Sequence, residues 1–177
     1  GKTSMARAIA SELGLQVVSA DSIRKALFGE QIAAKEYGQG AYSPEANIQT
    51  YTKMLECASE SILSRGGVVL DPTFRRRSDR DNVRRLAQSL GADFRFILCH
   101  LDPALIKQRL DRRVALKEGR SDATWLTYLR QSQEFESIDQ AETAQTRTLD
   151  TERPLSHCAR EVCDWLRSSI SEKDPPP

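Results

Sequence analysis

The sequence lacks any long hydrophobic run and any large excess of one charge. Its longest apolar stretch, FRFILCHL, is far too short to span a bilayer, and no charged-then-apolar signal segment is visible. With 26 lysines and arginines against 25 acidic residues, the formal net charge is +1. This balance argues against a protein that coats nucleic acid through a general positive field, although it leaves room for a local basic cleft. We expect no membrane partner.

Cysteines are few, and none of them belongs to a C-x-x-C pair. They are Cys57, Cys99, Cys158 and Cys163, of which the last two are five residues apart on a predicted helix and do not share a face well. A disulfide framework or a zinc site is expected to show a recognisable spacing. The cysteine usage therefore predicts isolated thiols in a reducing cytosol, and we expect a cytoplasmic protein.

What the sequence does contain is a regular alternation of strand and helix patterns over 177 residues, which is enough for one domain. Strands are predicted at 15–20, 67–71, 94–101 and 146–151, and helices at 4–13, 22–29, 44–65, 78–90, 103–114, 122–138 and 154–170. This alternation indicates an α/β domain with a mainly parallel sheet. We expect the domain at 1–170, with a lid at about 112–122 and a disordered tail at 171–177.

Local signals sharpen these expectations. Gly14 and Gly66 should end helices, and Ser43 should cap a helix that begins at Pro44. Ser78, with an aspartate three residues later, is typical of a capping box.

Burial can be predicted in the same way. The nearly all-apolar GVVLD should be a strand buried on both sides. In the helix at 22–29, Ile23, Ala26 and Leu27 should face inward, and His100 should be a core histidine of its strand.

The first three residues match the end of a phosphate-binding loop. A complete loop reads G-x-x-x-x-G-K-[ST], follows a buried strand and leads into a helix; its lysine neutralises phosphates and its hydroxyl ligates magnesium. Gly1, Lys2 and Thr3 match the last three positions, and Ser4 opens the amphipathic helix that follows at once. We expect that the natural chain starts earlier, with a hydrophobic strand and the first half of the loop. Without that central strand, its two neighbours would keep unpaired edges, so the fragment should fold poorly or bind nucleotide weakly.

Two aspartates follow predicted strands. Asp21 comes after LQVVSA, with Arg24 one helical turn further on, and Asp71 ends GVVLD. Ligands of an open parallel sheet bind at the carboxyl ends of its strands, so both carboxylates should lie near Lys2. One carboxylate can accept the proton of an attacking hydroxyl while another holds magnesium or its waters. Taken singly, each aspartate is equally well explained as a helix cap or turn residue.

Arginines are frequent beyond Asp71. Phosphoryl transfer needs donors that neutralise the migrating group. Arg109 and Arg113 share one helix face and lead into the predicted lid, which favours that role. The other cluster consists of Arg75, Arg76, Arg77, Arg80, Arg84 and Arg85, and we expect most of its members to be solvated surface.

These segments form an ordered series: GKTSMARAIASELGLQVVSADSIRKALFG, YSPEA, GGVVLDPTFRRRSDR and LDPALIKQRLDRR. The series resembles the small P-loop kinase-like domains of the AAA_33 family, often called AAA family ATPases and related to polynucleotide kinase, gluconate kinase and zeta toxins. Such domains are frequently fused behind a phosphotransferase-like domain. The resemblance implies a P-loop NTPase of NMP-kinase-like fold, whose phosphate-loop strand is central in a five-stranded sheet, and the cofactors ATP and Mg²⁺.

The resemblance also implies a role for each matching residue. Lys2 would contact the β- and γ-phosphates, and Thr3 the metal. Asp21 would be the base that activates the acceptor hydroxyl, with Arg24 on the acceptor's side and Asp71 near metal and acceptor. The lid arginines would be Arg109 and Arg113, and the segment 151–154 would border adenine.

The predicted function is therefore an ATP-dependent kinase that acts on a hydroxyl of a small molecule. One alternative is a polynucleotide 5′-hydroxyl kinase, which the arginines at 75–85 keep open. Another is an ATP-binding or ATPase module that serves a fused or partner domain, and a third is a decayed, inactive fragment.

Overall fold

The computed structural model describes residues 1–29, 39–115 and 124–171. The strands are β1 (Gln16–Ser19), β2 (Val68–Asp71), β3 (Phe96–His100) and β4 (Thr146–Asp150). The helices are α1 (Lys2–Leu13), α2 (Ala20–Phe28), α3 (Pro44–Arg65), α4 (Arg77–Ser89), α5 (Pro103–Ala115), α6 (Trp125–Gln133), α7 (Gln140–Thr143) and α8 (Leu155–Ser171), with a 3-10 turn, η2 (Gly40–Tyr42).

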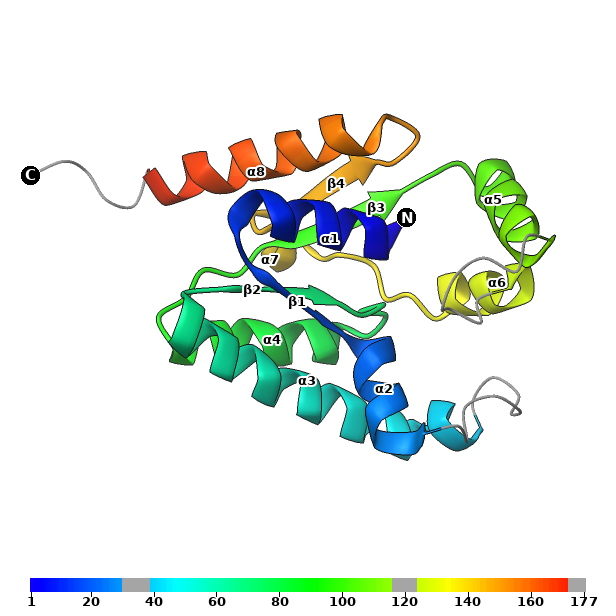
Figure 1. Cartoon of the computed structure of the whole chain (residues 1–177), viewed down its shortest axis with the longest axis horizontal. Helices are drawn as coiled ribbons and strands as arrows, with labels where there is room; N and C mark the ends of the chain where they lie inside the picture. Colours follow the sequence, from blue (N-terminus) through cyan, green and yellow to red (C-terminus); the bar gives the residue numbers. More distant parts are fainter. Residues whose placement is uncertain (30–38, 116–123, 172–177) are drawn as a thin grey trace, which may run out of the picture.

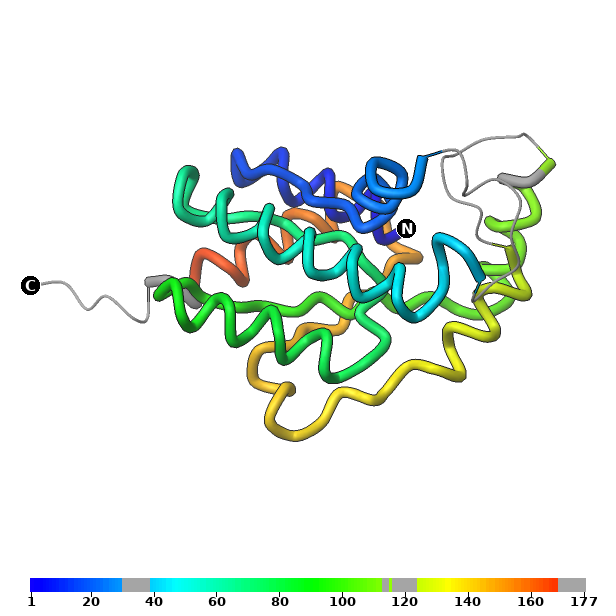
Figure 2. Tube along the Cα trace, turned by 90° about the horizontal axis from the view of Figure 1, so that it is seen from below, coloured from blue at the N-terminus to red at the C-terminus, as the bar shows by residue number. Residues whose placement is uncertain are grey.

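The elements form three layers. Helices α1 and α8 cover one side of the strands, and α3 and α4 cover the other (Figure 1). Helices α5 and α6 lie together beyond the carboxyl ends of the strands, on the same side as the start of α1 (Figures 1 and 2). None of the described helices combines the length and the apolar character that a membrane crossing requires.

The strands form two separate parallel pairs. β1 pairs with β2, with Ser19 in register with Asp71, and β3 pairs with β4. In the described part of the chain, β2 and β3 make no strand pairing with each other. The predicted α/β architecture with parallel strands is confirmed, but a single continuous sheet is not formed.

Each face of the strands has its own core. Met5, Ile9 and Val162 pack between α1, α8 and the second pair of strands, around Leu149. Val18, Met54, Phe74, Val83 and Phe96 form the core beneath the strands. A helix that packs on a sheet turns its apolar stripe toward the strands, and such stripes contribute to both clusters.

A large apolar groove separates the two strand pairs. Its volume is about 1040 Å³, and residues of β2 and β3 line it together with helix residues from both layers, such as Ile9 and Val83. The prediction that GVVLD is buried on both sides is wrong, because every residue of β2 is only partly buried. Val68–Asp71 pairs with β1 on one side and borders the groove on the other.

The helix-end signals were mostly correct. Gly14 and Gly66 end α1 and α3 in the left-handed conformation, and the Ser43 hydroxyl accepts the N–H of Ala46. The prediction of a capping box at Ser78 is wrong. α4 begins at Arg77, its first residue has no side-chain cap, and the carboxylate expected to complete the box pairs instead with arginines on its own helix.

Other local predictions need correction. In α2 the buried residues are Ala20 and Arg24, whereas Leu27 is 44% exposed. His100 is exposed rather than in the core. The helix predicted at 122–138 is shorter, since α6 ends at Gln133 and residues 135–139 before α7 have no regular secondary structure. Of the predicted lid and tail, residues 116–123 and 172–177 lie outside the described ranges.

Candidate active site

The start of α1 is exposed. Gly1, Lys2, Thr3 and Ser4 are all exposed, and the first intrahelical bond of this turn runs from Met5 N–H to the Gly1 carbonyl at 3.0 Å. The N–H groups before it have no partner within the helix, and the helix dipole adds positive potential there. No acidic residue lies in the first turn of α1, so no carboxylate of this turn competes for the position.

Lys2 and Asp71 line the same groove, at the carboxyl end of β2. Burial raises the pKa of the Cys99 thiol of β3, which lines the same groove. Lys2, Asp71 and Cys99 thus come from different segments and line one groove together.

Asp21 reaches this edge from the neighbouring strand. β1 ends at Ser19, which is in register with Asp71, and Asp21 follows in the first turn of α2. The Asp21 side chain is 52% exposed and accepts a bond from the Arg24 guanidinium at 3.3 Å. It is a solvent-accessible carboxylate in a fixed position, as a base for an incoming hydroxyl must be.

Arg24 is turned into the protein. It is 6% exposed; its Nε donates to the Ala41 carbonyl at 2.9 Å and one terminal nitrogen donates to Asn47 Oδ1 at 2.7 Å. The guanidinium also lies over the Tyr42 ring, 4.8 Å from its centroid. Arg24 thus ties α2 and Asp21 to η2 and α3. The sequence analysis did not identify Tyr42 and Asn47 as partners of Arg24. The signal that could have indicated such partners is an arginine at a buried position of an otherwise apolar helix face.

The turn after β2 is held in an uncommon conformation. Phe74 has φ 44°, a left-handed value that costs a branched or bulky residue free energy. Its ring packs edge-on against Tyr51 and Phe96, and its N–H donates to the Tyr51 hydroxyl at 3.3 Å. Burial raises the pKa of the Tyr51 phenol, while a hydrogen bond with Thr73 lowers it. The phenol stays neutral and fastens a turn that begins at Asp71.

The arginines at 75–85 are largely engaged within the protein. Arg77 pairs with Asp139 at 2.6 Å, Arg84 with Asp81 at 2.6 Å, and Arg75 with Glu134. Arg80 is fully buried against Glu142. The expectation that most of this cluster is solvated surface is wrong for Arg80 and Arg84, because both belong to the interface of α4 with the segment after α6.

Arg109 and the loop after β4 meet beside Gly1. Arg109 donates to the Thr151 carbonyl at 3.3 Å, and the Thr151 N–H and hydroxyl both donate to the His100 carbonyl, each at 2.9 Å. A Cβ built on Gly1 would lie 3.9 Å from the Thr151 hydroxyl. The loop predicted to border adenine therefore adjoins the phosphate-loop residues. For Arg113 the structure places only the backbone, in α5, and its side chain lies outside the described part.

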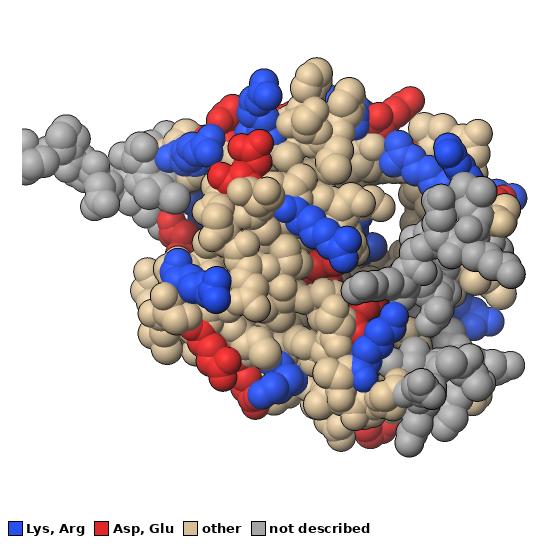
Figure 3. All heavy atoms as spheres, in the orientation of Figure 1, with Lys and Arg blue, Asp and Glu red and all other residues tan. Residues whose placement is uncertain are grey.

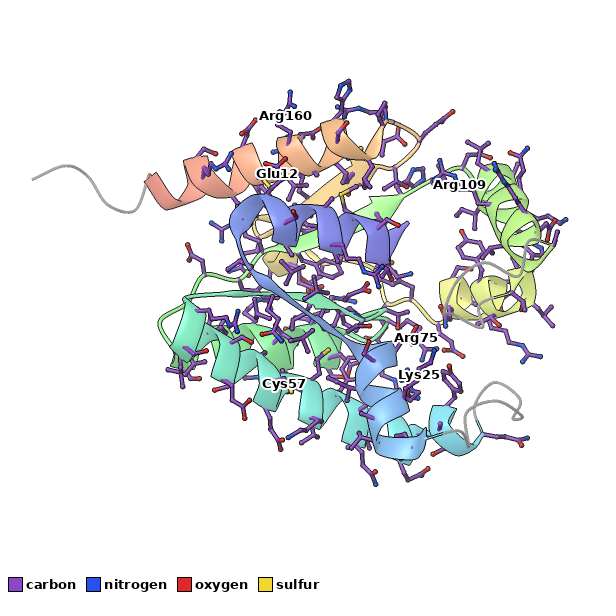
Figure 4. The ribbon with its side chains drawn as sticks, viewed as in Figure 1. Glu12, Lys25, Cys57, Arg75, Arg109 and Arg160 are labelled. Atoms are coloured by element: carbon purple, nitrogen blue, oxygen red, sulfur yellow. The ribbon has the colours of Figure 1, made fainter. Side chains whose placement is uncertain are left out.

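Figure 3 shows a hollow between the body of the molecule and the α5–α6 pair, with basic and acidic side chains on its walls. In the view of Figure 4, Arg109 and Arg75 come to this opening from opposite sides.

The residues present fit a magnesium ion that is shared with a nucleotide. In the described ranges no group of three or more His, Cys, Asp or Glu is clustered as a self-sufficient metal site. Magnesium in phosphotransferases uses one or two protein oxygens and takes the remainder from phosphates and water. The Thr3 hydroxyl and the Asp71 carboxylate are oxygen donors of this kind.

The chain belongs to the AAA_33 family of AAA domains, whose model matches residues 1–138. This confirms the P-loop kinase-like resemblance. An uncharacterized protein of Mycobacterium tuberculosis and one of Mycobacterium bovis are each 32% identical over 127 residues, which is 70% of this chain and 25% of the relative. The chain thus spans about a quarter of the length of these curated relatives.

Solved kinase structures share the fold. A gluconokinase from Sinorhizobium meliloti 1021 aligns with a TM-score of 0.65 at 21% identity, over 99% of this chain and 91% of that chain. A putative kinase from Chloroflexus aurantiacus gives a TM-score of 0.68 at 19% identity, over 96% and 89%. The APS kinase of Mycobacterium tuberculosis gives 0.61 at 17% identity, over 94% and 91%.

Proposed function

We propose that this chain is an ATP-dependent phosphotransferase domain that moves the γ-phosphate to a hydroxyl of a small molecule. The observation that carries the proposal is that Lys2 and Asp71 line one groove, while Asp21 follows the end of β1, whose last residue is in register with Asp71. Binding at this edge is general for open parallel sheets. The three residues come from three separate segments, which supports a shared role over three unrelated caps.

In this proposal the triphosphate lies at the start of α1. Lys2 neutralises the β- and γ-phosphates, and the N–H groups of Thr3 and Ser4 donate to phosphate oxygens. Mg²⁺, when bound with the nucleotide, would neutralise charge on the transferred group, held by the Thr3 hydroxyl and Asp71. The adenine would lie by the loop at Thr151, to which Arg109 is anchored.

Asp21 accepts the proton of the acceptor. The acceptor oxygen forms a bond to the γ-phosphorus, the bond to the bridging oxygen of ADP breaks, and the hydroxyl proton moves to a carboxylate oxygen of Asp21. Arg24 keeps that carboxylate in place from inside the protein. Arg109 and Arg113 remain candidates for the donors that close over the migrating group.

Two observations favour a small acceptor over a polynucleotide end. The structures that share the fold include proteins named gluconokinase, APS kinase and sugar kinase. The arginines that kept the polynucleotide alternative open include Arg77, Arg80 and Arg84. Each of these three forms an ion pair with a carboxylate of this chain.

We also propose that the groove between β2 and β3 receives a parallel strand, which the NMP-kinase-like fold has at the centre of its sheet. The groove is apolar, and strand edges of both pairs lie along it. A strand that runs parallel to β2 ends beside Gly1, where the first half of the phosphate loop is needed.

A phosphate-transfer screen tests the proposed function. The protein, extended by such a strand and half-loop, is incubated with γ-labelled ATP and Mg²⁺ and with polyols, sugars, nucleosides or oligonucleotides. Transfer of label to one of the small molecules supports the proposal. Label on oligonucleotide 5′-ends alone supports the polynucleotide alternative. ATP hydrolysis without any labelled acceptor supports the ATPase module.

Replacing Lys2 with alanine should weaken nucleotide binding by about 10- to 100-fold, since a charge-assisted bond to phosphate contributes about 1.5–3 kcal/mol. Titration with a fluorescent ATP analogue, in the extended protein, measures the change. Arg7→Ala is the matched control, because Arg7 is an exposed cation on the same helix. Equal affinities for the two variants would show that phosphates do not bind at the start of α1.

A further inference from the structure

A buried ion pair lies beneath the turn that follows Asp71. Arg80 is 0% exposed and Glu142 2% exposed. The pair is bidentate, with Arg80 Nε at 2.6 Å and a terminal nitrogen at 2.9 Å from the two carboxylate oxygens. The guanidinium is also packed between aromatic rings, 5.9 Å from the centroid of Phe96 and 5.4 Å from that of Phe135.

Stability alone does not explain this pair. Arg80 occupies the apolar stripe of α4, in line with the buried Val83 and Ala87. Desolvating two charges is costly, and apolar residues of similar size in such positions are often neutral or stabilising. Unlike an apolar residue, an arginine provides several hydrogen-bond donors in fixed directions. The other hydrogen bonds of Arg80 therefore indicate its structural role.

Those bonds reach the strained turn. The third guanidinium nitrogen of Arg80 donates a hydrogen bond to the Phe74 carbonyl at 3.1 Å. Phe74 is the left-handed residue, and its N–H is held by Tyr51. Both backbone polar groups of Phe74 are thus fixed by side chains from other elements, which offsets the cost of its conformation.

The same pair holds the extended segment 134–139, which we call the strap, between α6 and α7. Arg80 donates to the Ser137 carbonyl at 3.4 Å, and Glu142 closes a capping box with Asp139 at the strap's end. The strap lies against the turn itself, with the Glu136 N–H donating to the Arg75 carbonyl at 2.8 Å. One ion pair therefore fastens the turn after Asp71 and the segment that leads to the α5–α6 pair.

We infer that Arg80 and Glu142 are positioning residues, which lock the turn at 72–76 to the strap so that Asp71 and Thr73 face the phosphate end of the groove. The consequence for catalysis rests on the proposed function, whereas the locking itself does not. Neither residue lines the groove, so both act through the turn.

The test replaces the pair by apolar residues of similar length, R80M/E142L, in the full chain. Hydrogen exchange of the Phe74 and Glu136 amides is followed by NMR or mass spectrometry, together with the global unfolding temperature. We expect unfolding within a few degrees of the original chain but about tenfold faster exchange at these amides, because the Arg80 bonds to the Phe74 and Ser137 carbonyls no longer hold the turn and the strap in place. Unchanged exchange in a variant of unchanged stability overturns the inference.

A second variant covers the case in which the double substitution does not fold. Arg80→Lys keeps the charge opposite Glu142 but cannot make the bidentate pair and reach Phe74 at once. It should show the same local acceleration, and protection equal to that of the original chain would contradict the inference. Arg153→Met is the control, because it breaks a surface pair with Glu161 of the same 2.6 Å length, away from the turn.

Phosphate transfer gives an independent readout in the extended protein. For R80M/E142L we expect kcat to fall about tenfold with the KM for ATP unchanged, because Lys2 and the helix start are untouched. If exchange is faster but kcat is unchanged, Arg80 and Glu142 lock the turn without affecting catalysis. This outcome distinguishes a failure of the catalytic consequence from a failure of the locking role.

Discussion

Asp21→Asn should lower the rate of phosphate transfer by about 10²- to 10⁴-fold and leave the affinity for ATP unchanged, since general-base catalysis contributes a factor of this size. The amide keeps the size of the side chain but cannot take the acceptor's proton at neutral pH. Single-turnover transfer of labelled phosphate measures the rate, and nucleotide titration measures the affinity. The largest loss is expected at saturating acceptor.

The chain offers a close control for this substitution. Asp164→Asn breaks an Asp–Arg pair of the same i,i+3 spacing and the same 3.3 Å length, on α8. It should leave the transfer rate unchanged. A strong ATPase rate that survives Asp21→Asn would refute a base role and favour the module that serves another domain.

Supplying the central strand should have the second large effect. A segment of about five apolar residues and a G-x-x-G-x turn, joined ahead of Gly1, would fill the groove and pair with the edges of β2 and β3. Each buried apolar side chain contributes about 1.5–3 kcal/mol, against about 1–2 kcal/mol per residue for ordering the backbone. We expect a higher free energy of unfolding and, because the half-loop adds N–H donors to phosphate oxygens, at least about tenfold tighter binding of ATP.

The control extension carries a proline and an aspartate in the middle of the same segment. Proline removes a donor and the charge is expensive in an apolar groove, so neither gain should appear. Denaturant unfolding and nucleotide titration compare the two extended chains with the 177-residue chain. Equal ATP affinity of the short chain and the apolar extension would refute the requirement for a strand.

Much of the fold could be read from local chemistry. Ser43 before Pro44, and glycines at 14 and 66, mark helix ends because capping depends on a few neighbouring residues. The position of Asp71 at a strand end was likewise predictable, because parallel strands place their carboxyl ends at one edge. These signals require no knowledge of distant contacts.

Several of the failures concern residues whose partners are far away in the sequence. Arg24 is buried because Ala41 and Asn47, 17 and 23 residues away, satisfy its donors. Arg80 is buried because Glu142 lies 62 residues further along. The groove beside Val68–Asp71 leaves an apolar strand partly exposed, and no pattern within the strand reveals what its neighbour will be.

The sequence by itself thus determined the order of the elements, the helix ends at Gly14, Ser43 and Gly66, and the position of Asp71 at a strand end, since spacing and capping act over a few residues. Only the tertiary structure decided which arginines are buried, how the turn at Phe74 is held, and that β2 and β3 face each other across an apolar groove. The reason is physical: a charge or a strand edge is buried only when a distant group satisfies it, and that group is chosen by packing.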